Sequence, residues 1–590
     1  MNILYPILAA ALVLGVAVRL YPRWIAQVFQ EDDGNPPPSV RLADGKDYVK
    51  SRSHVVFGHH FATIAGAGPI VGPTLALAFG WGPVWLWVVL GGIFFGAVHD
   101  MTAMFTSVRE GGRSIARIAR TTLGPVGYVL NLIVLIFVLT IVNAIFLNLS
   151  VTALTSAYPL AALGLTGEQT LLRTAEQGGV VVGRVGGIAT TSVFVITAFA
   201  PILGWLIRRR GLSTPAAYAL ASLTCVASVV LGFAAPVMLS GDLWRVVMTF
   251  YVFAACTVPV WMILQPRDFT NVQLLYGGIA LLLLSTVIAG LFHGATIQAP
   301  ALDMATGERS LNGLIWPVLF ITVACGAISG FHSLVATGTT VKQIPRESDC
   351  RRIGYRAMIL ESFLAVLVLM AIASMLPQAE YLKVVYPAGA PSNPILAFAL
   401  GVGRLTNLAL PFIPVAVATV LGILMIEGFV VTTLDSSVRL ARYLLDEFWE
   451  FVYADAAPAV VRHPVFNTGV AVGLMFFFSV SGTVRQMWPV FGAGNQLIAA
   501  LALTTVSVWL VQRARQHLFA LVPAVFMILT TIAALFLLIR TNVASGNLVL
   551  AVTAVILLVL SVGVVVIGAT RFSQAIIRTR NLTVAQSRTS

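Results

Sequence analysis

The chain has 590 residues, of which 58% are hydrophobic and only 10% are charged, and its formal net charge is +13. This composition excludes an ordinary soluble protein, which needs far more charge to cover its surface. Repeated apolar runs of about twenty residues predict a polytopic helical membrane protein and exclude an outer-membrane barrel, whose strands alternate and are about half as long. The positive charge indicates no nucleic-acid partner, because the basic residues lie in short loops between the apolar runs.

Fifteen apolar segments are candidate membrane helices. In chain order they are Ile3–Leu20, His54–Phe79, Gly82–Ser107, Gly127–Ser150, Thr190–Ile207, Thr214–Val237, Trp244–Gln265, Gln273–His293, Gly313–Ala336, Ala357–Leu376, Leu408–Val430, Phe466–Val484, Val490–Val511, Leu518–Leu538 and Leu548–Thr570. The first has no preceding basic residue and no clear cleavage site after it, which predicts a retained helix rather than a signal peptide. With the N-terminus outside, every strongly basic loop falls on the cytoplasmic side. We therefore expect an odd number of spans and a cytoplasmic C-terminus.

The loops between these segments contain no separate soluble domain. We expect an N-terminal helix and loop over residues 1–53, a membrane core over 54–511, and peripheral helices with a cytoplasmic tail over 512–590. The longest expected loops are Tyr21–Ser53, Val151–Ala189, Pro377–Asn407 and Thr432–Val465. The last contains DEFWEFVYADAAPAVVRH, which is typical of an interfacial helix with aromatic residues at headgroup level.

The stretch FGHHFATIAGAGPIVGP, Phe57–Pro73, is apolar but contains residues that break helices. Gly66, Gly68 and Pro69 leave backbone groups that lipid cannot satisfy, and a membrane tolerates such backbone only inside protein or around a cavity. We therefore predict a discontinuous helix, interrupted within Ile64–Ile70, whose half-helix ends suit a carboxylate or a cation. A simple kink, or close helix packing through small residues, is the plainer alternative.

A second segment, SGFHSLVATGTT, repeats part of this pattern. The spacing Gly-x-His-x5-Gly begins at both Gly58 and Gly330, and the charge-derived topology makes the two helices antiparallel. Two interrupted helices in opposed orientation indicate an inverted-repeat transporter. The match rests on three positions, so coincidence is the alternative. If the match is meaningful, we expect His60 and His332 to face a common central cavity.

Several polar residues lie within apolar segments, where acidic groups are costly unless they are functional or held by a partner. They are Asp100, Glu361, Glu427, Asp435, Asn495 and Gln496. Asp100 and Glu427 lie deepest and favour function. Asp435 is four residues from Arg439, so an ordinary ion pair within one helix explains it equally well. Glu361 lies near a basic loop and is either functional or interfacial.

The histidines and cysteines indicate no metal site. His59 and His60 are adjacent, so their rings point about a hundred degrees apart on a helix and lack the i, i+4 spacing of metal ligands. Substrate contact or proton relay is the better hypothesis, because histidine titrates near physiological pH. The four cysteines show no metal-binding spacing. We expect no metal and no other cofactor.

Six motifs together resemble the carbon starvation protein A (CstA) family. They are FGHHFATIAGAGPIVGP, GAVHD, VPVWMILQPRDF, SGFHSLVATGTT, TTLDSSVRLAR and WPVFGAGNQ, in the family's order from about Lys46 to Leu503. The resemblance implies a plasma-membrane importer of peptides or, with protons, of pyruvate, related to the amino acid–polyamine–organocation superfamily and its LeuT-like core. This chain has two more spans between the interrupted helices than the ordinary version of that core. Family members have glutamine as well as histidine at the position of His99, which argues against an essential role for that ring.

Together these features predict a secondary active importer of short peptides or pyruvate-like acids, acting in carbon starvation. The expected substrate-binding residues are His59, His60, Gly66, Ala67, Gly68, Pro69, His332, Ser333, Thr337, Asn495 and Gln496. The coupling proton is expected on Asp100 or Asp435, with Glu427 and Glu361 as further candidates. An intramembrane enzyme or a channel is the alternative, but the chain contains no H-E-x-x-H or G-x-S-x-G motif. The expected partners are the small substrate, a proton and the lipid bilayer; the oligomeric state does not follow from the sequence.

Overall fold

The computed structural model describes residues 1–44, 48–259, 262–388 and 392–589, and most of them are helical. The N-terminal half contains α1 (Leu4–Phe29), α2 (Pro38–Arg41), α3 (Ser53–Ile64), α4 (Gly68–Ala76), α5 (Trp81–Gly91), α6 (Ala97–Arg109), α7 (Ile115–Thr122), α8 (Gly124–Leu154), α9 (Gly186–Arg209), α10 (Thr214–Ala234), α11 (Gly241–Thr257) and α12 (Leu264–Phe292). The rest contains α13 (Met304–Leu311), α14 (Ile315–Thr322), α15 (Gly330–Gly338), α16 (Arg356–Met375), α17 (Gln378–Val385), α18 (Pro394–Ala409), α19 (Val415–Tyr453), α20 (Pro464–Ser479), α21 (Val484–Val511), α22 (Leu518–Ala544) and α23 (Leu548–Thr589). Short π-helical segments join α5 to α6 and precede α16.

Among the described residues, eleven helices are long and apolar enough to cross a membrane, and a bent pair, α3 with α4 and the short 3-10 turn that follows it, makes a possible twelfth. The chain is therefore a multi-pass helical membrane protein, as predicted. The count of fifteen spans stays a prediction, because α18 and α20 are apolar but shorter.

Besides Tyr21–Ser53, which contains the end of α1 and all of α2, the three other expected loops contain regular structure. The loop expected over Thr432–Val465 is wrong in its first half, because α19 continues as one helix of 39 residues to Tyr453. The charged residues in this part of α19 are typical of a loop, but several of them are buried and contact other helices. The segment expected as the loop Pro377–Asn407 contains α17 and most of α18.

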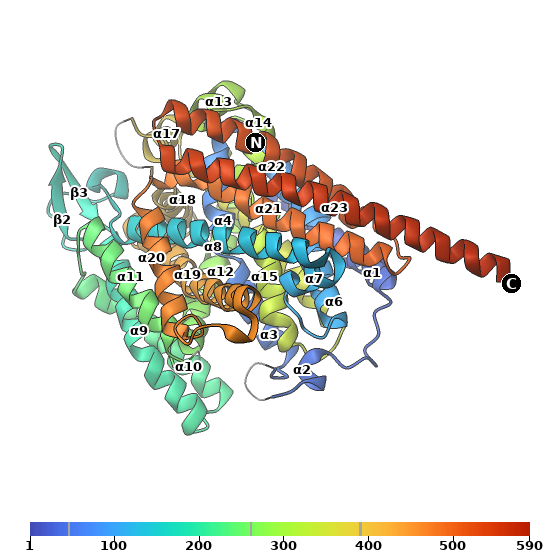
Figure 1. Ribbon diagram of the computed structural model, residues 1–590. Helices are drawn as coiled ribbons and strands as arrows, with labels where there is room; N and C mark the ends of the chain where they lie inside the picture. The colour runs from blue at the N-terminus through green and yellow to red at the C-terminus, as the bar shows by residue number, and fades with distance from the viewer. Residues whose placement is uncertain (45–47, 260–261, 389–391, 590) are drawn as a thin grey trace.

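The third of these segments, Val151–Ala189, carries a small antiparallel sheet with the strand order β1-β3-β2. The strands are β1 (Ala157–Pro159), β2 (Thr174–Gln177) and β3 (Val180–Arg184), and Tyr158 pairs with Gly183. The sheet lies at the end of the group formed by α9, α10 and α11 (Figure 1).

The centre of the bundle is formed by α8, α16, α19 and α21, and the apolar stretch of α21 is buried along its whole length. Helices α1, α10 and α12 are peripheral and expose apolar side chains that suit a lipid surface, among them Leu8, Leu223 and Leu291. The last helix, α23, runs beside α22 and continues beyond the bundle (Figure 1). The interrupted segments meet inside this bundle, where α15 packs against α3, α6 and α21.

Candidate functional site

The first interruption separates α3 from α4. Helix α3 ends at Ile64, α4 begins at Gly68, and the pair bends by 41°. The amide of Gly66 donates to the carbonyl of Ile64 at 2.8 Å, which is too local for an α-helix, and Pro69 has no amide hydrogen to donate. The interruption therefore lies inside the Ile64–Ile70 range indicated by the glycines and the proline.

The second interruption lies between α14 and α15, at residues 323–329. The expectation of one helix over Gly313–Ala336 is wrong here, and the break precedes His332 instead of surrounding it. The freed carbonyls at the end of α14 accept side-chain hydrogen bonds, from Trp488 Nε1 to Thr322 at 2.9 Å and from Trp87 Nε1 to Val323 at 3.0 Å. Satisfying these groups is what makes a buried break tolerable.

The two interruptions are in direct contact. A Cβ atom added at Gly68 would lie 2.1 Å from the Cβ atom of Cys325, and one added at Gly72 would lie 2.8 Å from the carbonyl oxygen of Thr322. Only glycine fits at such distances. Sequence positions 68–72 and 322–326 therefore form one packed centre.

A buried cluster of ionisable side chains adjoins this centre. His332 on α15 lies between two carboxylates, with Nδ1 2.9 Å from Oδ2 of Asp100 and Nε2 3.4 Å from Oε2 of Glu361. His99 contacts the other oxygen of Asp100 at 2.7 Å. All four side chains are fully buried. The alternative that Glu361 is interfacial is therefore wrong.

The composition of this cluster suits the binding of a proton. With Asp100 and Glu361 both ionised and His332 protonated, the group has one uncompensated negative charge, and such a charge is costly away from water. One additional proton makes the cluster neutral. The site can thus alternate between two protonation states whose relative energy depends on the surrounding helices.

His59 and His60 separate as their adjacency predicts. His60 is fully buried, and its Nδ1 lies 2.8 Å from the hydroxyl of Thr340. Helix α3, which carries His60, packs against α15, which carries His332. His59 is only half-buried. The structure thus brings His60, but not His59, into the interior beside His332.

The other predicted substrate residues lie around the second interruption. Asn495 accepts from the amide of Phe331 at 3.0 Å and donates to the hydroxyl of Ser329 at 3.1 Å, so it fixes the start of α15. Gln496 donates to the carbonyl of Phe320 at 2.6 Å, near the end of α14. Ser333 and Thr337 donate to carbonyls of their own helix. The contacts of Asn495 and Gln496 hold the interruption in place. A role in substrate binding stays a prediction for all four residues.

The family-model comparison decides which family this is. The model described as "Carbon starvation protein CstA" matches residues 2–392 and 387–534. The chain belongs to the CstA family. It is 29% identical to the Bacillus subtilis peptide transporter CstA, covering 97% of this chain and 98% of that one. It is also 29% identical to the Escherichia coli pyruvate/proton symporter BtsT, covering 90% of this chain and 81% of that one.

One solved structure that resembles this CstA-family chain is MhsT in complex with L-phenylalanine. The TM-score is 0.45 at 13% identity, and the match covers 88% of this chain and 99% of the MhsT chain.

Asp435 belongs to a second buried charge cluster of this CstA-family protein. It forms an ion pair with Arg267 on α12 and accepts from the hydroxyl of Tyr251 at 2.9 Å. The alternative of an ion pair with Arg439 is wrong, because the Arg439 guanidinium instead donates to the carbonyls of Ala255 and Val258, at 3.0 and 3.1 Å. Asp435 is therefore held by a partner from another helix.

Arg267 is the main charged residue that the sequence reasoning missed. It stands in the motif VPVWMILQPRDF, of which Val260 and Trp261 lie outside the described residues, as does Lys46 near the start of the matched region. A basic residue inside an apolar segment is rare and marks a partner or a function. That signal was available, but the partner lies 168 residues away in the chain.

Glu427 is fully buried, and neither of its carboxylate oxygens has a hydrogen-bond partner among the described residues. It lies on α19, two turns before Asp435 and near Ser150 on α8. The structure does not join it to the Asp100 cluster by any ion pair between described residues.

Proposed function

We propose that this CstA-family protein is a secondary active transporter that imports short peptides or pyruvate-like carboxylates with protons. The observation that carries the proposal is the buried contact of His332 with Asp100 and Glu361, beside two interrupted helices that touch. A proton site attached to movable half-helices is what coupling requires, because protonation then changes the energy of one arrangement relative to another. The names of the peptide transporter from Bacillus subtilis and the pyruvate/proton symporter from Escherichia coli support the same function.

The coupling proton binds to the group formed by Asp100, His332 and Glu361. Asp100 lies on α6, His332 on α15 and Glu361 on α16, so the side chains that bind the proton connect three helices. Asp435 is the weaker candidate, since its carboxylate already pairs with the Arg267 guanidinium. Glu427 remains a candidate for a second proton because it is buried without a hydrogen-bond partner among the described residues.

The substrate carboxylate binds where the two interruptions meet. Helix α4 begins with Gly68 and Pro69, and a helix N-terminus attracts negative charge through its free amide groups and its dipole. His60 adds a polar, titratable ring nearby, and its Nε2 atom is buried without a hydrogen-bond partner among the described residues. Ala67 and the first turn of α15 complete the proposed contacts.

The core has the LeuT-like inverted repeat, in which α3–α4 and α14–α15 are the two discontinuous helices. In the described part of the chain, the longer helices between them are α5 continued by α6, then α8, α9, α10, α11 and α12, and the short helices α7 and α13 lie there too. We place residues 54–511 in this core and residues 512–590 at its periphery. The protein lies in the inner membrane, with the N-terminus outside and the C-terminus in the cytoplasm, as the positive-inside rule indicates.

Uptake by purified protein in proteoliposomes tests this function. Labelled pyruvate and a labelled dipeptide are supplied separately, with and without an imposed inward proton gradient. We expect accumulation of one of the two only when the gradient is present. Accumulation driven by sodium alone would contradict proton coupling, and equal equilibration of both without accumulation would indicate a channel.

A further inference from the structure

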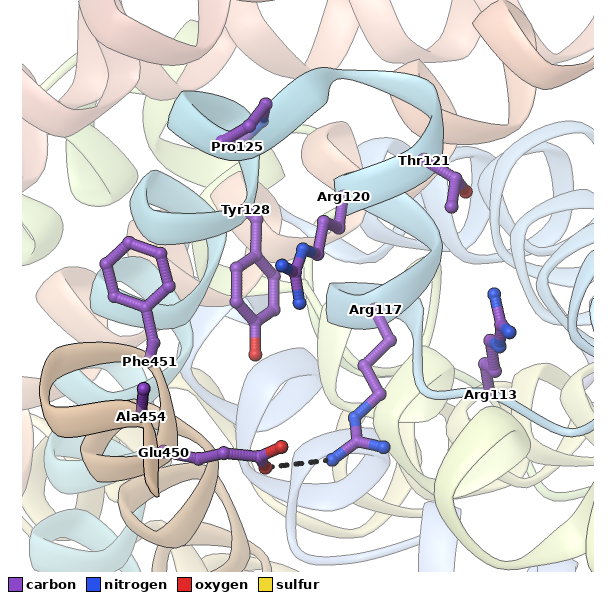
Figure 2. A pocket seen from close by; sticks show the side chains of 9 residues that line it. All are labelled: Arg113, Arg117, Arg120, Thr121, Pro125, Tyr128, Glu450, Phe451 and Ala454. Carbon is purple, nitrogen blue, oxygen red and sulfur yellow. Dashed lines mark hydrogen bonds and ion pairs between the residues drawn. The ribbon is translucent and has the colours of Figure 1, made fainter. Parts of the chain in front are cut away.

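A cavity of about 720 Å³ lies beside the arginine-rich segment that contains α7. Its walls are α7, the start of α8 and the end of α19, and its lining residues include Arg113, Arg117, Arg120, Tyr128 and Glu450 (Figure 2). None of them belongs to the buried centre described above. The cavity is therefore a second candidate site.

The charges around this cavity are unbalanced. Arg117 is shared by two carboxylates, Glu447 at 3.4 Å and Glu450 at 3.3 Å. Arg113 and Arg120 have no ion pair with any carboxylate in the described part of the chain, and the guanidinium of Arg120 lies over the Tyr128 ring at 5.6 Å. Two guanidinium groups are thus left to bind an anion. Arginine forks match phosphate oxygens in geometry as well as in charge.

The cavity also has apolar lining residues, Pro125 and Phe451, and Phe451 is 43% exposed. Val126 follows Pro125 in the chain and is 68% exposed. Helix α8, which is long and apolar enough to cross a membrane, begins at Gly124 beside the cavity. The arginines therefore stand at headgroup level, with apolar side chains beside them that suit acyl chains.

We propose that this cavity binds the phosphate headgroup of an anionic phospholipid. Arg113 and Arg120 contact the phosphate oxygens, while Phe451 and Pro125 contact the upper acyl chain. A soluble phosphate compound shares the charged part of this chemistry but gains nothing from the apolar lining residues. The apolar lining residues therefore favour the lipid over the free anion.

The cavity is connected to the second interrupted helix. The amide of Ile115, the first residue of α7, donates to the hydroxyl of Thr337 on α15 at 3.2 Å. Arg117 ties the same short helix to α19. A bound headgroup thus holds α7 against α15, which carries His332, and against α19, which carries Glu427 and Asp435. If the proposed transport function is correct, the anionic lipid content of the membrane changes the transport rate.

The binding test does not depend on transport. Purified protein in neutral detergent is titrated with dioctanoyl phosphatidylglycerol, and bound lipid is counted by native mass spectrometry. The double variant Arg113→Gln, Arg120→Gln is compared with the wild type. Each arginine in contact with an anionic headgroup is worth about five-fold in affinity, so the double variant should bind roughly 30-fold more weakly.

A matched control removes two other basic residues at the end of an apolar helix. Arg209→Gln, Arg210→Gln has the same loss of charge, and Arg210 also lies over an aromatic ring, that of Trp205 at 5.1 Å, but neither residue lines the cavity. This control should bind phosphatidylglycerol as the wild type does. Equal weakening in both double variants would show that only net charge matters and would overturn the proposal.

Two further ligands distinguish the source of the phosphate. Dioctanoyl phosphatidylcholine has the same chains without net charge and should bind weakly to all variants. Inorganic phosphate or glycerol phosphate should not displace the lipid at similar concentrations. If either does displace it, the ligand is a soluble anion and the lipid assignment is wrong. Unchanged phosphatidylglycerol binding by Arg113→Gln, Arg120→Gln would also overturn it.

Discussion

His332 and Asp100 are 232 residues apart in the chain, yet their side chains meet at 2.9 Å inside the bundle. The second nitrogen of the same ring faces Glu361. The contact with Asp100 is a hydrogen bond, whereas that with Glu361 is an ion pair at 3.4 Å. The ring attracts both carboxylates most strongly when both of its nitrogens carry protons. Loss of one of these protons therefore weakens one of the two contacts. The change acts directly on α15, because His332 lies in its first turn.

The variant Asp100→Asn tests the role of this carboxylate. It preserves the size of the side chain but removes the charge that accepts the proton. We expect gradient-driven accumulation to be abolished, while exchange of labelled for unlabelled substrate across the membrane persists. Both activities are measured on the same proteoliposomes. Unchanged accumulation would show that Asp100 does not carry the proton, and Glu427 would become the candidate.

The ion pair between Arg267 and Asp435 should matter mainly for stability. Breaking a buried pair leaves an uncompensated charge and costs about 3–5 kcal/mol. Arg267→Met should lower the Tm more than Asp435→Asn, because Asp268 also faces the guanidinium, at 3.5 Å. The control Asp242→Asn removes an exposed carboxylate paired with Arg245 and should leave the Tm nearly unchanged.

Transport by Asp435→Asn gives an independent check on this assignment. Uptake per folded molecule should keep its dependence on the proton gradient. A variant with an unchanged Tm but no coupling would show instead that Asp435 carries the proton.

The contact between the two interruptions predicts a rescue. Gly68→Ala places a methyl group 2.1 Å from the Cβ atom of Cys325, and such overpacking typically costs about 1–3 kcal/mol. The double variant Gly68→Ala, Cys325→Gly should recover much of the lost Tm and transport. Gly473→Ala on α20 is the control, because no atom lies within 4 Å of its added Cβ. Failure of the rescue would mean that the two segments separate in the folded protein.

An ion pair outside the membrane-spanning helices predicts a pH effect on stability. Arg404 donates to both oxygens of Glu380, at 2.6 and 2.7 Å, and these hydrogen bonds lower the pKa of Glu380. A lowered pKa in the folded state stabilises the protein above the unfolded pKa of about 4.3, and the contribution is lost as the pH falls below that value. The Tm of Glu380→Gln should therefore fall less steeply between about pH 5 and pH 3 than that of the wild type. Glu176→Gln, at an exposed position on β2, should follow the wild type.

The sequence locates the first interruption but places the second too late in the chain, near His332, for a physical reason. Residues 64–70 contain two glycines and a proline, which cannot complete a helical hydrogen-bond ladder. Residues 323–329, VACGAIS, contain one glycine and no proline, so nothing local opposes a helix. That interruption depends on distant groups, such as Trp488 and Asn495, which satisfy its backbone.

The members of the buried cluster were predictable individually but not as a group. Asp100, His332 and Glu361 each stand in an apolar segment. The free-energy cost of placing an ionisable side chain there makes each of them a candidate functional residue. Their contacts join three helices, and no periodicity within one segment reports such a contact. The same holds for Arg267 with Asp435. The predicted helix Leu408–Val430 ends too early for a related reason. The charged residues that follow it are typical of a solvent-exposed loop, but Arg439 and Arg442 are buried and donate to carbonyls at the end of α11.

The most direct test of the central claim is the movement of protons with substrate. Proteoliposomes containing a pH-sensitive dye receive pyruvate or a dipeptide, without an imposed gradient, and internal acidification is recorded together with substrate entry. The wild type should acidify the lumen in fixed proportion to the substrate that enters. Glu361→Gln and Asp100→Asn should exchange labelled substrate without acidification. Acidification by both variants at the wild-type ratio would contradict the assignment of the proton to Asp100, His332 and Glu361.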